Sequence, residues 1–133
     1  MKSEEIAKIL LKNKAIILNA KDPFTFVSGM RSPIYCDNRR MIAYPRERVQ
    51  IVNAFINELK RFNFDIVAGT STAGIPWASW ISERLYKPFA YIRGSKKGHG
   101  ARNQIEGANV EGKSVIIIED LISTGGSSFC AVE

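Results

Sequence analysis

The sequence predicts an α/β fold with a parallel sheet at its core, and three observations support this prediction. Continuous apolar segments at residues 65–69, 88–92 and 115–118 have the length and composition of strands. A segment with apolar residues at helical spacing separates the first two. Strands that are apolar without alternation are typical of a parallel sheet covered on both faces. We therefore expect a parallel α/β core.

The N-terminal part is expected to be a helix followed by a small β-rich hood. Ser3 precedes two glutamates, which is a favourable helix start. Residues 15–18 are either the end of this helix or a short strand. Short apolar runs in residues 23–35 are broken by Ser-Gly and Ser-Pro pairs, which favours short strands over a helical layer.

Two helices are expected to cover the core. The first begins at Pro45, because proline suits the first helical position. Its expected core face comprises Val49, Val52, Ile56 and Leu59, which recur at spacings of three and four. The second begins at Pro76, and its apolar residues are Trp77, Trp80, Ile81 and Leu85. A basic loop is expected over residues 93–109, before the strand at 115–118.

Length and composition limit the classes of protein that the chain can represent. Its 133 residues suit one domain, divided into an N-terminal helix and hood (1–44) and an incomplete α/β core (45–133). The sequence has no signal peptide and no apolar run of about 18 residues, so a cytoplasmic location is expected. Cys36, Cys130 and one histidine are too few for a disulfide scaffold or an ordinary zinc site.

The basic residues are concentrated in one place. Lysine and arginine number 19 against 13 acidic residues, a net charge of +6 that permits nucleic acid or a polyanionic small molecule as ligand. One glycine-containing stretch holds Arg93, Lys96, Lys97, His99 and Arg102. A nucleic-acid groove more often spreads its charges and interleaves aromatic residues. We therefore expect a compact anion as ligand, and neither nucleic acid nor a membrane as partner.

The strongest local signal follows the strand at 115–118. Glu119 and Asp120 come first, and the hydroxyl- and glycine-rich residues 123–127 come next. Glycines let backbone N–H groups converge on an anion, and a helix N-terminus adds positive charge, so residues 123–127 are predicted to hold a phosphate. The two carboxylates can accept hydrogen bonds from two ribose hydroxyls. The pattern predicts a ribose 5-phosphate site; an ordinary turn with a solvated acidic pair is the alternative.

Two other segments suit the same kind of ligand. The small residues of segment 69–76 follow a strand and let backbone amides approach an anion, although a plain turn is the alternative. Gly94, Gly98 and Gly100 predict a mobile basic loop. Such a loop can close over a leaving diphosphate, exclude water and stabilise negative charge. A solvated charged loop is the alternative.

The segment after the strand at 115–118 resembles the motif of the phosphoribosyltransferases that binds 5-phosphoribosyl 1-diphosphate (PRPP). Segments 24–40, 69–76 and 91–107 resemble orotate phosphoribosyltransferases in matching order. The resemblance implies transfer of 5-phosphoribosyl from PRPP to orotate, giving orotidine 5-monophosphate and diphosphate in pyrimidine (UMP) biosynthesis. It implies Mg²⁺ bound through PRPP, with no direct protein ligands. It also implies a homodimer whose basic loop reaches the neighbouring subunit's site.

The resemblance also implies individual site residues. PRPP-binding positions are Lys21, Thr72, Ala73, Gly74, Arg93, Lys96, Lys97, His99, Glu119, Asp120, Leu121, Ile122, Ser123, Thr124, Gly125, Gly126 and Ser127. Orotate-binding positions are Ser28, Gly29, Arg31 and Ser123, and the catalytic residues are Lys97, His99 and Asp120. Many members carry a lysine directly after the arginine, where this chain has Gly94, and Lys96 is the candidate to supply that charge.

Three alternatives complete the sequence-based interpretation. Residues 107–114 match the nucleotide P-loop pattern, but they precede a strand instead of following one, so ATP binding is not expected there. A purine-type phosphoribosyltransferase and a PRPP-sensing regulator that binds nucleic acid are the alternative functions. Because Glu133 falls within the helix expected after the phosphate site, we expect a fragment of a longer enzyme; replacement of the missing elements by assembly is the alternative.

Overall fold

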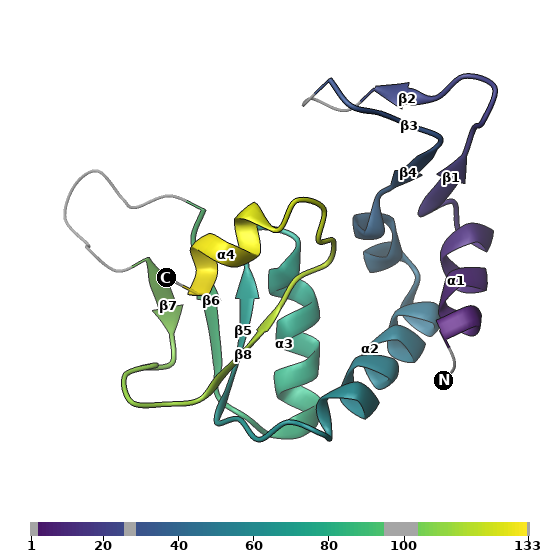
Figure 1. The fold of residues 1–133 in the computed structure, drawn as a ribbon. Helices are drawn as coiled ribbons and strands as arrows, with labels where there is room; N and C mark the ends of the chain where they lie inside the picture. The colour runs from purple at the N-terminus through teal and green to yellow at the C-terminus, as the bar shows by residue number, and fades with distance from the viewer. Residues whose placement is uncertain (1–2, 26–28, 95–103, 133) are drawn as a thin grey trace. The chain divides into compact units, whose positions relative to one another are not determined.

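The structure is a computed structural model that describes residues 3–25, 29–94 and 104–132 (Figure 1). The chain divides into two compact units, Met1–Ile51 and Val52–Glu133, each described by itself. Helix α2 (Pro45–Leu59) contains the boundary between them. The helix begins at Pro45, as its sequence predicts.

The N-terminal unit contains a helix and two small antiparallel sheets. Helix α1 (Ser3–Lys12) leads into β1 (Ile16–Leu18), so the residues after α1 form a strand. β1 pairs with β4 (Ile34–Cys36), and β2 (Phe24–Thr25) pairs with β3 (Arg31–Ser32). The predicted β-rich hood is therefore present in the structure.

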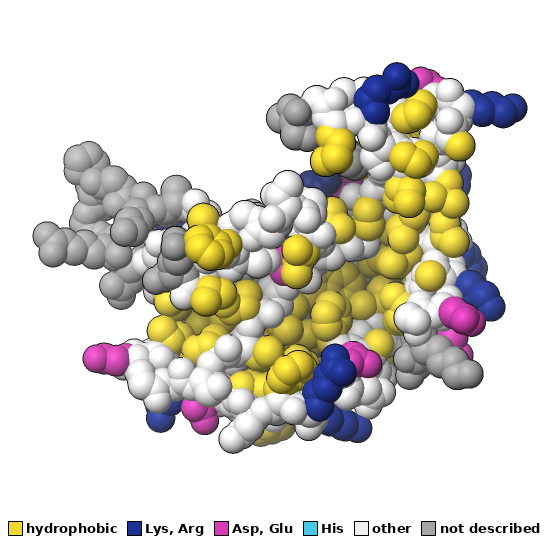
Figure 2. Space-filling view, viewed as in Figure 1, with side chains coloured by type: hydrophobic (Ala, Val, Ile, Leu, Met, Phe, Trp, Pro, Cys, Tyr) yellow, Lys and Arg dark blue, Asp and Glu magenta, His cyan; other side chains and the backbone are white. Residues whose placement is uncertain are grey.

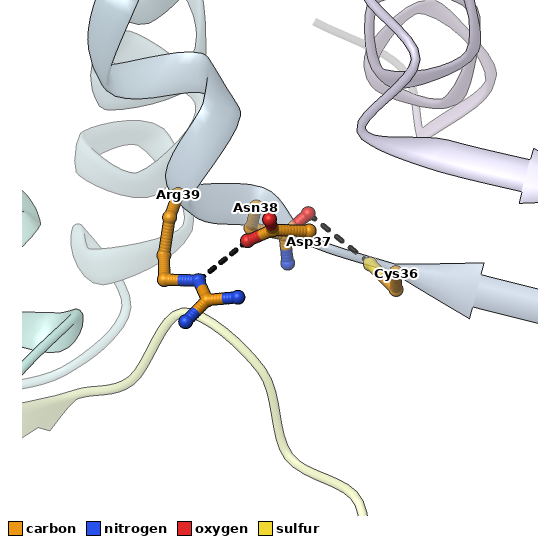
Figure 3. A network of polar contacts seen from close by, with 4 residues as sticks. All are labelled: Cys36, Asp37, Asn38 and Arg39. Carbon is orange, nitrogen blue, oxygen red and sulfur yellow. Dashed lines mark hydrogen bonds and ion pairs between the residues drawn. The ribbon is translucent and has the colours of Figure 1, made fainter. Parts of the chain in front are cut away.

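A short polar network lies where β4 passes into the 3₁₀ helix η1 (Asn38–Ala43) (Figure 3). The Arg39 Nε donates a hydrogen bond to the Asp37 carboxylate, and the Cys36 thiol donates to the Asn38 side chain. The hydrogen bond from Arg39, together with its charge, holds the pKa of Asp37 below its usual value. The Asp37 N–H donates to the carbonyl of fully buried Ala15 at 2.7 Å, which ties this turn to the residue before β1.

The C-terminal unit is built around a four-stranded sheet with the order β7-β6-β5-β8. Its elements in chain order are β5 (Ile66–Thr70), α3 (Gly74–Leu85), β6 (Phe89–Ile92), β7 (Ile105–Gly107), β8 (Val115–Ile118) and α4 (Gly126–Val132). β5 pairs in parallel with both β6 and β8, which confirms the predicted parallel core. β7 runs antiparallel to β6, so the sheet is mixed.

β7 corrects the prediction of an uninterrupted loop over residues 93–109. It has only three residues and one large apolar side chain, which is too little for a recognisable strand pattern. It forms because it pairs with β6 in the antiparallel direction, with Tyr91 opposite Glu106. This pairing, and not local propensity, makes it a strand.

Side chains of the sheet alternate between two faces, and different elements cover each face. Ile66 and Ala68 belong to one apolar cluster, against which Ala131 of α4 packs. On the other face Gly69 lies so close to α3 that an added Cβ would stand 2.9 Å from the Ala78 Cβ. Ala78, together with Trp77, is buried on the inner side of α3. The central strand β5 is buried at every residue as a result.

Two details of the predicted helices are wrong. Val49 was expected on the core face of α2 but is 37% exposed, whereas Ile51 is buried at 7% exposure. Helical spacing identifies an apolar stripe but cannot show which edge of it meets other elements. Helix α3 begins at Gly74 and not at Pro76. Proline is tolerated there because the first N–H groups of a helix have no partner within it.

Candidate functional site

Three connections leave the sheet at the same edge. Since β5, β6 and β8 are parallel, their carboxyl ends lie together, and ligands of open α/β sheets bind in this position. The Ser71 N–H donates to the Ile92 carbonyl at 2.8 Å, which joins the ends of β5 and β6. The Thr70 hydroxyl lies 3.5 Å from the Ile118 carbonyl oxygen, to which it donates across to β8. The residues that follow these three strands are therefore neighbours.

The β5–α3 turn brings main-chain groups and only small side chains to this edge of the sheet. Thr72 is exposed, Ala73 is half-buried and Gly74 is buried. A Cβ on Gly74 would stand 2.5 Å from the Ile118 carbonyl oxygen and 2.6 Å from the Thr70 hydroxyl oxygen. Only glycine fits between the two strand ends, and the start of α3 thus packs directly against the end of β8.

The β8–α4 connection carries the predicted ribose and phosphate residues. Glu119 and Asp120 follow β8 directly and are both half-buried. The Asp120 N–H donates to the Glu119 carboxylate at 3.2 Å. Ser123 and Thr124 are exposed in the turn that follows. The two carboxylates and the two hydroxyls are thus placed in sequence along one connection at the sheet edge.

A glycine allows this connection to turn into α4. Gly125 has a φ of +82°, in the left-handed region that favours glycine. Its carbonyl accepts a hydrogen bond from the Phe129 N–H at 2.8 Å, which closes the first turn of α4. The glycine-rich turn before a helix is therefore present as predicted. Phosphate binding there stays a prediction.

Several large hydrophobic side chains are exposed along this part of the unit. Leu121 and Ile122 lie in the β8–α4 connection, and Phe129 and Val132 lie in α4. Figure 2 shows hydrophobic side chains gathered over β8 and α4 in the face that it presents. In the described sheet β8 pairs only with β5, so β8 is an edge strand. Leu121 and Ile122, which the resemblance places among the PRPP-binding positions, have exposed side chains.

Arg93 brings positive charge to the end of β6. Its N–H donates to the Gln104 carbonyl at 2.8 Å, continuing the β6–β7 pairing. Its guanidinium lies 3.0 Å from the Glu106 carboxylate, with the two side chains 30% and 35% exposed. Glu106 was not predicted from the sequence. The available signal was an acidic residue placed next to a glycine in an otherwise basic stretch.

The structure brings together only part of the predicted site. The positions at the sheet edge are Thr72, Ala73, Gly74, Arg93, Glu119, Asp120, Leu121, Ile122, Ser123, Thr124, Gly125 and Gly126. Lys21, Gly29 and Arg31 are exposed residues of the N-terminal unit, which is described separately. Ser28, Lys96, Lys97, His99 and Arg102 lie outside the described residues, as does the side chain of Ser127.

The described residues show neither a metal-binding cluster nor a membrane-spanning helix. Within residues 3–25, 29–94 and 104–132 no three His, Cys, Asp or Glu side chains are grouped so as to hold a metal ion. None of the helices in that part of the chain combines the length and apolar composition needed to cross a membrane.

Comparisons with known proteins give a consistent result. The phosphoribosyl transferase domain family matches residues 46–128. The chain is 53% identical over 129 residues to the orotate phosphoribosyltransferase of Coxiella burnetii, covering 96% of this chain and 62% of that relative. The chain thus spans less than two thirds of that relative's length.

Two solved structures are similar over nearly the whole chain. The Leishmania donovani UMP synthase has a TM-score of 0.84 and 35% identity, covering 99% of this chain and 28% of that one. The orotate phosphoribosyltransferase from Aeropyrum pernix has a TM-score of 0.75 and 30% identity, covering 96% of this chain and 71% of that one.

Proposed function

Because this chain belongs to the phosphoribosyltransferase family, we propose that the whole protein is an orotate phosphoribosyltransferase of pyrimidine biosynthesis. It would transfer the 5-phosphoribosyl group from PRPP to orotate, releasing diphosphate and forming orotidine 5-monophosphate. The observation that carries the proposal is the meeting of the β5–α3 turn and the β8–α4 connection at one sheet edge. The choice of orotate is supported by the similarity to the orotate phosphoribosyltransferases of Coxiella burnetii and Aeropyrum pernix.

The proposed mechanism assigns each connection one part of PRPP. Glu119 and Asp120 accept hydrogen bonds from the ribose hydroxyls, and the turn at 123–127 donates hydrogen bonds to the 5-phosphate. The main chain of residues 72–74 approaches the diphosphate. These contacts hold the anomeric carbon in position for attack by the pyrimidine nitrogen of orotate, for which Ser123 is a proposed contact together with Ser28, Gly29 and Arg31.

Catalysis in this mechanism is chiefly electrostatic. As the bond to diphosphate breaks, positive charge develops on the ribose, as in glycoside chemistry, and negative charge develops on the leaving group. Arg93 and the basic residues that follow it, Lys96, Lys97 and His99, would stabilise the diphosphate. Lys21 is a further proposed PRPP contact. Asp120, together with Glu119, would orient the ribose by accepting hydrogen bonds from its hydroxyls.

Magnesium is proposed to bind through PRPP. Oxygen ligands suit this cation, which commonly uses substrate phosphates together with few protein carboxylates. When bound, it would neutralise charge on the diphosphate. Glu119 and Asp120 are half-buried carboxylates at the sheet edge and thus fit a role beside a phosphate-bound cation.

A homodimer in the cytoplasm is the proposed setting. The support for the dimer is the resemblance of residues 91–107 to a family loop that enters the neighbouring site. The support for a cytoplasmic setting is the small number of cysteines, Cys36 and Cys130, which is usual for proteins of a reducing compartment. Neither nucleic acid nor a membrane is a proposed partner.

The test is binding and turnover in the full-length protein. Calorimetry with PRPP and Mg²⁺ should show saturable binding, and turnover should require orotate and not uracil or a purine base. Turnover with a purine base alone would indicate a purine-type enzyme. PRPP binding without transfer to any base would favour a PRPP-sensing regulator. Absence of PRPP binding would remove the basis of the proposal.

A further inference from the structure

The β6–β7 hairpin holds an arginine and a glutamate together beside the proposed PRPP site. Tyr91 is opposite Glu106 in the pairing register, and the Arg93 N–H donates to the Gln104 carbonyl at 2.8 Å. Side chains two residues apart on a strand share a face, so Arg93 is on the face of Tyr91 and diagonal to Glu106. The 3.0 Å contact between guanidinium and carboxylate follows from this register.

The carboxylate of this pair stands on a tightly fixed backbone. Gly107 follows Glu106 with a φ of +98°, and a Cβ there would stand 2.6 Å from the Phe89 carbonyl oxygen. The Ala108 N–H donates to the same oxygen at 2.9 Å. The end of β7 is therefore held directly against β6, and this contact fixes the backbone next to Glu106.

The backbone of Arg93 starts next to the β5–α3 turn. The Ser71 N–H donates to the Ile92 carbonyl, so the residue after Ile92 stands beside the first residue of that turn. A guanidinium has five N–H donors in a fixed plane, and the hydrogen bond to Glu106 uses the Nη1 group. The other donors can bind an anion while this contact persists.

We propose that Glu106 is a positioning residue that orients Arg93 for the diphosphate of PRPP. The inference rests on the proposed function and adds to it a residue that does not touch the substrate. A long arginine side chain loses conformational freedom when it binds, and the carboxylate removes much of that loss in advance. Partly exposed ion pairs contribute little to folding stability, so the main effect falls on anion binding.

The direction in which Glu106→Gln changes PRPP affinity distinguishes a positioning role from a purely electrostatic one. Glu106 is an anion close to a proposed anion site, and its own charge repels PRPP. If charge alone mattered, Glu106→Gln would tighten PRPP binding. If Glu106 positions Arg93, the same change weakens PRPP binding, because the arginine side chain then loses conformational freedom when PRPP binds.

The experiment is a double-mutant cycle in the full-length protein, with PRPP and Mg²⁺ followed by calorimetry. Glu106→Gln should raise the PRPP Kd about tenfold when Arg93 is present, the scale of coupling between contacting residues. In the Arg93→Ala background the same change should have almost no effect. The KM for orotate should stay unchanged in Glu106→Gln. Glu111→Gln, an equal change of charge at an exposed turn residue, is the matched control and should leave the Kd near that of the wild type.

Each result has a definite meaning. Tighter binding in Glu106→Gln would overturn the inference, as would an equal loss in both Arg93 backgrounds or wild-type affinity in Arg93→Ala. These three results leave the proposed function intact if the wild type still transfers to orotate. A wild type that binds no PRPP would overturn the proposed function and, with it, the positioning role.

Discussion

Gly74 at the start of α3 lies directly against the carbonyl oxygen of Ile118 at the end of β8, with no room for a Cβ between them. This contact joins the turn proposed to approach the diphosphate to the strand that presents the carboxylates. It fixes the spacing of the two connections through main-chain atoms, which cannot move as a flexible side chain can. Stability and PRPP affinity should therefore both depend on this glycine.

Gly74→Ala should destabilise the full-length protein by about 1–3 kcal/mol, the usual cost of forcing extra volume into a packed region. Urea unfolding measures the change, and calorimetry should show weaker PRPP binding. Gly94→Ala is the control for stability, because a Cβ there meets nothing within 4 Å. Equal unfolding free energies for Gly74→Ala and the wild type would contradict the tight contact.

Asp120→Asn should weaken PRPP binding by about 1–3 kcal/mol, the cost of losing a charged hydrogen bond to a ribose hydroxyl. Calorimetry with PRPP and Mg²⁺ measures this loss. Inorganic phosphate should bind both proteins alike, because the change affects the ribose contact and not the phosphate turn. Unchanged PRPP affinity would show that Asp120 does not hold the ribose.

Asp37→Asn should reduce stability only where the carboxylate is charged. Arg39 lowers the folded-state pKa of Asp37 below 3.8, so this stabilisation is present above the unfolded pKa and is lost as the pH falls through the lower folded value. The difference in unfolding free energy should be about 0.5 kcal/mol near neutral pH, as for other partly exposed pairs, and should vanish in acid. Asp22→Asn, at an exposed carboxyl of the same unit, is the control. A difference that persists at low pH would point to a packing effect.

Mixed dimers should show whether the basic loop acts across the subunit interface. Lys97→Ala should lower turnover by about 10²–10³, as removal of one electrostatic donor does. Mixing this subunit with an Asp120→Asn subunit places both defects in one site and neither in the other if the loop acts in trans. Activity should then recover towards half of the wild type per mixed dimer. No recovery, despite subunit exchange shown by mass spectrometry, would contradict action in trans and leave PRPP binding unaffected.

Much of the fold and of the proposed chemistry could be predicted because the signals are contiguous. The apolar run of β8, the acidic pair and the glycine-rich turn follow one another without a gap, and each has a local physical meaning. Pro45 likewise begins α2 through a backbone preference that depends on no distant residue. Local conformation and the order of chemical groups along the chain were therefore determined by the sequence itself.

The tertiary structure alone decided which distant groups meet. No local pattern shows that β7 pairs with β6, that Ile51 is buried while Val49 is exposed, or that Glu106 contacts Arg93. Each depends on strand register or on which side of an element faces a neighbour, and these are set by the packing of the whole unit. The closeness of Gly74 and Ile118 has the same origin, because two separate connections become neighbours only when β5 and β8 pair in parallel.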